Sequence, residues 1–223
     1  MAGATVKLNE NTLAYEARPD SKVKAPGVVV IHEVTGLVDY IKDVTRSLAE
    51  QGYLALAVDL YEGKTASGLE EGKPIRDKIT EAVFKAKIGA AIRYLKSSPH
   101  STGQIGVMGF CMGGGFALWA ACLFPEDFKA CTVFYGRLEN LELLRNLHSP
   151  VLGNFGAEDK GITTWAVEQF KPAMERLGKR LDMKVYPGAP HGFHRHTAPN
   201  VYRPEAAQDA FQRTLNLFAE ALR

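Results

Sequence analysis

A chain of 223 residues is long enough to bury one sizeable core, and its 46% hydrophobic and 23% charged content is ordinary for a globular protein. A net charge of +2 without any lysine- or arginine-rich segment argues against a nucleic-acid partner, because phosphate binding needs concentrated positive charge. No apolar run approaches the roughly 18 residues of a membrane span, and the N-terminus lacks a signal-peptide core, so we expect no membrane partner.

Short apolar runs alternate with longer amphipathic stretches along the whole chain. In chain order the predicted elements of the first half are an edge strand (12–16), a buried strand (27–32), a helix (39–51), a buried strand (54–59), a polar loop (60–73) and a helix (74–95). Those of the second half are a strand (105–109), a helix (112–124), two strands (132–135 and 151–156), a helix (162–177), a strand (183–186) and a terminal helix (204–222). Pro74 is expected in the first turn of its helix.

This alternation of strands and helices predicts an α/β fold, with a mainly parallel sheet and helices on both faces. No linker rich in proline, glycine and serine and no internal repeat divides the sequence, so we expect residues 1–223 to form a single domain. Ligands of such folds bind at the carboxyl ends of the strands, which makes the residues that follow each strand the informative ones.

The most informative of these segments reads Gly-Phe-Cys-Met-Gly-Gly over residues 109–114. A strand that turns sharply into a helix between glycines is typical of the nucleophile elbow of the α/β-hydrolase fold. Such a turn exposes Cys111, and the positive end of the following helix dipole favours the thiolate form of a cysteine. Cys111 is therefore a candidate nucleophile, and the alternative is a small buried apolar residue on a tight turn.

A nucleophile needs a base, and the base needs an orienting group. The order of these groups along an α/β-hydrolase chain is nucleophile, acid and histidine. Asp159 follows one predicted strand and His191 follows the last, so both are expected at the carboxyl edge of the sheet beside Cys111. Glu158 is the alternative acid. Taken singly, the aspartate can cap a helix or an Asx turn, and the histidine can stabilise a turn.

Together these motifs resemble the dienelactone hydrolase family. The resemblance rests on Gly-Phe-Cys-Met-Gly-Gly, on Gly-Ala-Glu-Asp and His-Gly-Phe downstream, and on His-Glu-Val-Thr-Gly at residues 32–36, and it extends from about Gly27 to the C-terminus. It implies an α/β-hydrolase fold without a large lid and a triad of Cys111, Asp159 and His191. The implied activity is that of a carboxymethylenebutenolidase, which hydrolyses an enol lactone to maleylacetate, without a cofactor.

The resemblance also gives roles to residues outside the triad. Glu33 is placed beside the nucleophile, where a carboxylate disfavours the thiolate by charge repulsion and, once shifted by substrate, can accept the thiol proton. The alternative for Glu33 is a solvated strand end. The oxyanion hole is assigned to the backbone N–H groups of Val34 and Met112.

Three further residues are expected to bind substrate. Arg195 stands four residues after the histidine, where the family binds a substrate carboxylate, and we expect it to pair with Glu33 in the empty site. A second family arginine matches only Arg76, in a region where the loop is shortened. Tyr135 follows a predicted strand and is expected to line the pocket, with core packing as the alternative.

The remaining histidines and cysteines bear on metal binding and on the cellular compartment. His191, His194 and His196 do not have the spacing of a zinc site, and we expect no metal. Three cysteines, an odd number, favour a reducing cytoplasm, with Cys122 and Cys131 packed in the core. We expect a monomer. Alternative activities are a general carboxylesterase, a thioesterase or a non-catalytic binder of a small molecule.

Overall fold

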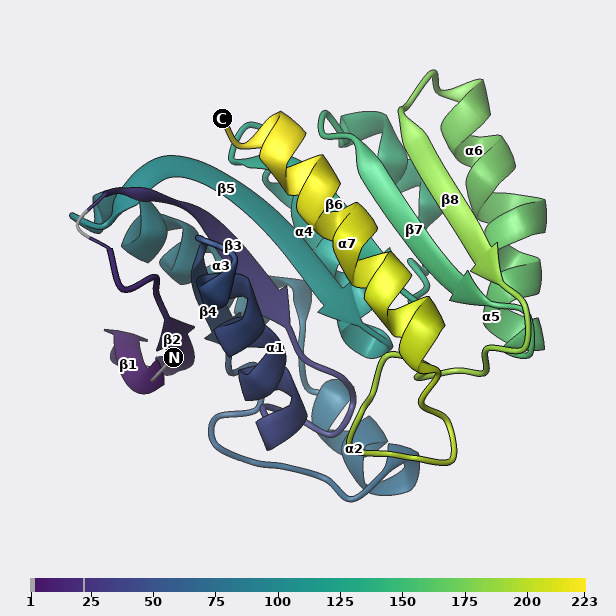
Figure 1. The fold of residues 1–223 in the computed structure, drawn as a ribbon, viewed down its shortest axis with the longest axis horizontal. Helices are drawn as coiled ribbons and strands as arrows, with labels where there is room; N and C mark the ends of the chain where they lie inside the picture. Colours follow the sequence, from purple (N-terminus) through teal and green to yellow (C-terminus); the bar gives the residue numbers. More distant parts are fainter. Residues whose placement is uncertain (1–2, 22) are drawn as a thin grey trace.

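The computed structural model describes residues 3–21 and 23–223, and its strands form one eight-stranded sheet (Figure 1). The strands are β1 (Gly3–Asn9), β2 (Thr12–Ala17), β3 (Ala25–Ile31), β4 (Leu54–Val58), β5 (Ser101–Phe110), β6 (Phe128–Phe134), β7 (Val151–Gly156) and β8 (Leu181–Tyr186). Their order across the sheet is β1-β2-β4-β3-β5-β6-β7-β8. All neighbours from β4 to β8 are parallel, and only the pairs that involve β2 are antiparallel. The predicted mainly parallel α/β fold is confirmed.

Helices pack on both faces of this sheet, as Figure 1 shows. One face carries α1 (Asp39–Glu50) and α7 (Pro204–Ala221), and the other carries α3 (Glu81–Ser97), α4 (Met112–Leu123), α5 (Lys160–Trp165) and α6 (Lys171–Arg176). Successive side chains of a strand point to opposite faces. In β3, Val28 and Val30 therefore join the core under α1 and α7, whereas Val29 and Ile31 join the core on the other side. This double burial explains the unbroken β-branched run in the sequence.

The prediction for residues 60–95 is wrong in its boundaries. A helix, α2 (Leu69–Arg76), begins inside the predicted loop, and Pro74 lies in the interior of that helix instead of in a first turn. The long helix α3 starts only at Glu81, where the Thr80 hydroxyl accepts a hydrogen bond from the Val83 N–H (3.3 Å). The start of α3 is therefore set by the Thr80 cap, which satisfies a free N–H group, and not by Pro74.

Two smaller expectations also differ from the structure. The strand predicted at the sheet edge is β2, which lies inside the sheet because β1, absent from the prediction, pairs with its outer side. The helix predicted over 162–177 consists of three consecutive segments, in which a π-helical turn (Ala166–Phe170) joins α5 to α6. Pro172 follows that turn, and its missing N–H removes one regular helical hydrogen bond there.

The carboxyl ends of the parallel strands lead into the segments that carry the candidate site. Those segments are the loop after β3, the start of α4 after β5, the start of α5 after β7 and the connection from β8 to α7. Within residues 3–21 and 23–223, no helix combines the length and the apolar character needed to cross a membrane.

Candidate active site

Cys111 occupies a strained turn between β5 and α4. Its backbone has φ 55° and ψ −121°, a region that non-glycine residues rarely adopt and that often marks a functional position. A Cβ on Gly109 would collide with the Gly113 carbonyl, and one on Gly113 would collide with the Ile31 carbonyl, so the turn requires both glycines. Met112 is the first residue of α4, and its N–H has no acceptor inside the helix. The half-buried Cys111 side chain thus lies beside a free backbone donor.

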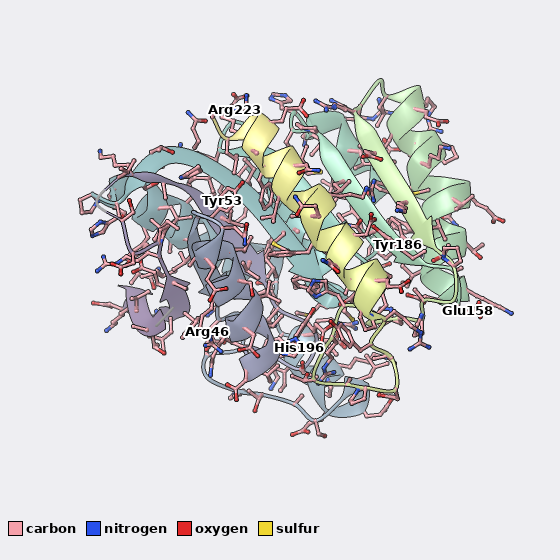
Figure 2. The ribbon with its side chains drawn as sticks, viewed as in Figure 1. Arg46, Tyr53, Glu158, Tyr186, His196 and Arg223 are labelled. Carbon is pink, nitrogen blue, oxygen red and sulfur yellow. The ribbon has the colours of Figure 1, made fainter. Side chains whose placement is uncertain are left out.

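His191 and Asp159 are joined by a short hydrogen bond. The His191 Nδ1 atom lies 2.6 Å from Asp159 Oδ2. Burial lowers the pKa of His191, but its interactions with Asp159 and Cys111 outweigh this effect and raise that pKa to about 10. Glu158, the alternative acid, points to solvent and is labelled in Figure 2. The histidine partner in this structure is therefore Asp159.

Glu33 is a buried carboxyl group at the end of β3, with 4% of its surface exposed. Its Oε2 atom lies 3.7 Å from Arg195 Nη1, the ion pair expected from the sequence, and its Oε1 atom accepts a hydrogen bond of 3.5 Å from the Tyr135 hydroxyl. Burial raises the pKa of Glu33, whereas Arg195 and His191 oppose this rise. Arg195 and His191 thus favour the ionised form of Glu33, whereas burial favours its neutral form.

Arg195 has donors that the protein does not use. Its Nε atom is buried and has no hydrogen-bond partner among the described residues, and the ion pair of its Nη1 atom with Glu33 is long at 3.7 Å. A buried donor without an acceptor is costly. The guanidinium is therefore poised to take an anionic group from outside the protein.

His32 fixes the peptide group between Glu33 and Val34. Its ring is fully buried, its Nδ1 atom lies 2.7 Å from the Glu33 carbonyl oxygen, and its Nε2 atom accepts a hydrogen bond of 3.2 Å from the Leu60 N–H. Burial lowers the pKa of His32, so the ring is neutral, with its proton on Nδ1. In a trans peptide the C=O and N–H groups point in opposite directions, so a carbonyl held by His32 turns the Val34 N–H away from that ring.

We expect His32→Phe to lower kcat by about 100-fold with little change in KM, since one misplaced oxyanion donor costs this much. The His32→Asn variant is the matched control, because its amide nitrogen can donate from nearly the position of Nδ1. Steady-state kinetics of both variants, with thermal unfolding as a check on folding, measure the effect. Equal kcat values for His32→Phe and the parent protein would contradict this role of His32.

The two remaining candidates are Tyr135 and Arg76. Tyr135 does not line an open pocket, because its side chain is fully buried; it packs edge-on against the His191 ring, 5.1 Å away. Its backbone has φ 40°, and it directly follows β6, which ends at Phe134. Arg76 is bound to its neighbour Asp77 through Nε (2.9 Å) and Nη2 (2.6 Å).

Tyr61 connects the region of Arg76 with the elbow and was missed in the sequence. Burial raises the pKa of its hydroxyl to about 12, and Arg76 opposes that rise, which places the guanidinium near this phenol. The hydroxyl lies 3.3 Å from Met112 Sδ and 3.4 Å from the Gly72 carbonyl oxygen. The sequence assigned no role to Tyr61, because its contacts join three segments that meet only in the fold.

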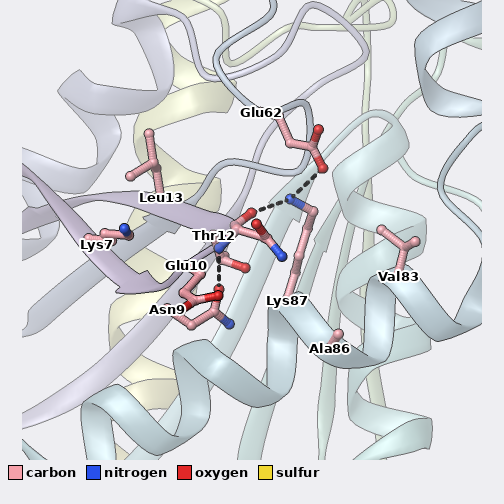
Figure 3. A pocket seen from close by; sticks show the side chains of 10 residues that line it. Lys7, Asn9, Glu10, Thr12, Leu13, Glu62, Val83, Ala86 and Lys87 are labelled. Carbon is pink, nitrogen blue, oxygen red and sulfur yellow. Dashed lines mark hydrogen bonds and ion pairs between the residues drawn. The ribbon is translucent and has the colours of Figure 1, made fainter.

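A cavity of about 950 Å³ lies outside this site, between the β1–β2 hairpin and α3 (Figure 3). The buried Lys87 borders it, pairs with Glu62 at 3.4 Å and donates a hydrogen bond of 3.2 Å to the Asn11 carbonyl oxygen. None of the candidate site residues lines this cavity. The chemistry at the carboxyl edge, and not cavity size, locates the site.

No group of three histidine, cysteine, aspartate or glutamate side chains within residues 3–21 and 23–223 has an arrangement that fits a metal ion. His194 instead bonds to the Tyr40 hydroxyl through Nδ1 (2.9 Å), and His196 bonds to Asp43 through Nε2 (3.1 Å). Both imidazoles thus have partners in the protein.

The comparisons with known proteins agree with this geometry. A model of the dienelactone hydrolase family matches residues 13–222. A protein of Methylorubrum extorquens named "Putative carboxymethylenebutenolidase" is 32% identical, with 93% of this chain and 76% of the relative covered. A Bradyrhizobium protein named "Probable 2-oxo-3-(5-oxofuran-2-ylidene)propanoate lactonase" is 31% identical over 92% of this chain and 88% of its own. The solved structure of a "Putative Dienelactone Hydrolase" from Klebsiella pneumoniae superposes with a TM-score of 0.90 at 29% identity, covering 98% of both chains. The chain is a hydrolase and belongs to the dienelactone hydrolase family.

Proposed function

We propose that this protein hydrolyses a small lactone or ester that carries a carboxylate, and that an enol lactone of the dienelactone type is its substrate. The reaction proceeds through an acyl-enzyme on Cys111. The observation that carries the proposal is the convergence of the elbow cysteine, the His191–Asp159 hydrogen bond and the Glu33–Arg195 ion pair at one edge of the sheet. The names of the relatives from Methylorubrum and Bradyrhizobium support the same class of reaction.

The first step is attack of the Cys111 thiolate on the carbonyl carbon. The N–H groups of Met112 and Val34 stabilise the oxyanion that develops. His191, protonated near neutral pH because its pKa is raised, gives its proton to the leaving oxygen. The neutral imidazole then takes a proton from water, and the hydroxide releases the acid from the thioester. Asp159 holds the ring in the orientation that both steps need.

Glu33 couples this chemistry to substrate binding. Arg195 favours the ionised form of this carboxyl group, against the burial that raises its pKa. A substrate carboxylate competes for Arg195 and weakens the interaction of this arginine with Glu33. The buried Glu33 carboxyl group then favours its own protonated form. The proton that it accepts is that of the Cys111 thiol, so the thiolate forms when the substrate arrives. A resting thiol also resists oxidation better than a thiolate.

The charge on Arg195 predicts which substrates bind. We expect Arg195→Ala to raise KM at least about tenfold for substrates with a carboxylate, because a charge-assisted hydrogen bond contributes about 1.5–3 kcal/mol. KM for the methyl ester of the same compound stays unchanged. Arg180→Ala is the matched control, since that arginine pairs with Glu220 at the surface. Equal KM shifts for charged and uncharged substrates would contradict the role of Arg195.

An ultraviolet assay on dienelactone, run beside a panel of small esters and thioesters, tests the proposed function itself. We expect loss of the lactone absorbance at a kcat/KM well above that for any uncharged ester. Faster turnover of simple esters or thioesters would favour a general carboxylesterase or thioesterase instead. Hydrolysis of no member of the panel would contradict the proposal and favour a binding protein.

We also infer that the chain acts as one domain in a reducing compartment. A single sheet includes strands from Gly3 to Tyr186, and the three cysteines are unpaired. Neither inference depends on the identity of the substrate.

A further inference from the structure

Four side chains form a buried row that leads away from the nucleophile. The Tyr135 hydroxyl lies 3.5 Å from Glu33 Oε1 and 3.5 Å from the Tyr40 hydroxyl. The Tyr40 hydroxyl lies 2.9 Å from His194 Nδ1. Glu33, Tyr135 and Tyr40 have at most 4% of their surface exposed, so water does not reach the middle of the row.

The far end of the row opens into a second cavity. His194 lines a cavity of about 220 Å³ between α1 and the segment that leads into α7. His196, labelled in Figure 2, shares this cavity and bonds to Asp43 of α1. A water occupies about 30 Å³ in the liquid, so the cavity holds several waters. The row thus connects the site to solvent by a route that a bound substrate does not block.

The reaction itself produces a proton that must leave. Hydrolysis of an ester at neutral pH yields a carboxylate and one proton. In the proposed mechanism, which this inference takes as its basis, Glu33 holds the thiol proton while the substrate occupies the cleft. Cys111 regains a proton from the product acid, and Glu33 must then lose its own before the next cycle.

We propose that Tyr135, Tyr40 and His194 carry this proton from Glu33 to the second cavity. The Glu33 carboxyl gives its proton to the Tyr135 oxygen, Tyr135 gives its own to Tyr40, and Tyr40 gives its own to His194 Nδ1. His194 releases the proton on Nε2 to water in the cavity. Each O–H or N–H bond that forms replaces one that breaks, and one proton leaves per turnover.

The protonation states of the groups along the row fit this direction of transfer. Burial and the neighbouring His196 lower the pKa of His194 to about 3, so its ring is neutral and one nitrogen can accept the proton of Tyr40. Burial also raises the pKa of Tyr40 and Tyr135, so neither phenol ionises on its own and each passes one proton as it receives another.

Other charged and titratable groups face the two ends. Arg195 and His191 lie at Glu33, and both favour its ionised form once the proton has left. His196, Asp43 and Tyr202 line the cavity at His194. The ion pair of His196 with Asp43 places an acceptor for the released proton at the cavity.

Burst kinetics of Tyr40→Phe test the path, because removal of one hydroxyl breaks it without changing any group that contacts substrate. We expect the first turnover of a chromogenic ester to keep its rate within about twofold, while steady-state turnover falls about tenfold, a loss within the range for an assisted proton transfer. His194→Ala behaves in the same way, and added imidazole restores its turnover by entering the cavity. The solvent isotope effect on steady-state turnover rises in both variants.

Tyr53→Phe is the matched control, since that buried tyrosine donates an equally long hydrogen bond (3.5 Å) to the Leu215 carbonyl outside the row. Equal steady-state rates for Tyr40→Phe and Tyr53→Phe, with no imidazole effect on His194→Ala, would overturn the proton path alone. Absence of any hydrolysis by the parent protein would instead refute the proposed function, and the path with it.

Discussion

Replacing Cys111 by alanine is expected to lower kcat/KM for every hydrolysed substrate by about 10⁴-fold or more, the size of effect seen when a nucleophile is removed. The reason is that the sulfur forms the bond of the acyl-enzyme, and no other described nucleophile occupies the elbow. The oxyanion donors and the binding groups remain and leave only residual catalysis. Steady-state kinetics on dienelactone and a chromogenic ester measure the loss.

Cys122→Ala is the control for this prediction. Cys122 lies on the same helix, is buried with 2% of its surface exposed, and packs in the core, so its loss changes packing and not chemistry. Activity near that of the parent protein is expected after correction for folded fraction. If Cys111→Ala retained activity within about tenfold of the parent, another group would be the nucleophile.

Asp159→Asn is expected to lower kcat by about 10³- to 10⁴-fold, since an amide in place of the carboxylate misorients the imidazole and no longer stabilises its charge. The pKa of His191, raised to about 10 in the parent protein, falls toward the ordinary value of about 6.5. Titration of the ring by NMR measures that fall directly. Glu158→Gln, which changes an exposed carboxylate beside Asp159, leaves both kcat and this pKa unchanged.

The same pKa predicts how stability depends on pH. A histidine with a folded-state pKa above its unfolded value stabilises the fold through its charged form. This contribution is complete below about pH 6.5 and disappears as the pH rises through about 10. The difference in unfolding free energy between the parent and Asp159→Asn is therefore largest near pH 6 and shrinks as the pH rises toward about 10. A difference that grew with pH would contradict the charged state of His191.

The sequence predicted the parts of the fold that depend on local pattern. The buried strands β3 and β4 carry continuous apolar runs, and the glycines of the elbow are required by collisions that the structure shows. The order of cysteine, aspartate and histidine, each after a strand, placed all three at one edge. Parallel strands bring their carboxyl ends together, so this much of the site follows from spacing.

The remaining features depend on contacts between distant segments. The start of α3 is set by the Thr80 cap, which Pro74 obscured in the sequence. The hydrogen bond from Tyr135 to Glu33 joins residues 102 positions apart, and the bond from Tyr40 to His194 joins residues 154 positions apart. The hydrophobic periodicity of the sequence is a local pattern and contains no information on such long-range contacts. The positive φ of Tyr135 likewise has no signal in its residue type, since tyrosine rarely adopts it.

The central claim is that Cys111 becomes acylated during turnover, and mass spectrometry of the quenched reaction tests it most directly. The protein is mixed with a chromogenic ester, stopped in acid within the first turnover and digested, and the peptide that contains Cys111 is weighed. We expect this peptide to gain the mass of the acyl group, and to lose that mass when the reaction runs to completion before quenching. A burst of leaving group with no acyl mass on this peptide, or with the mass on another residue, would contradict the account.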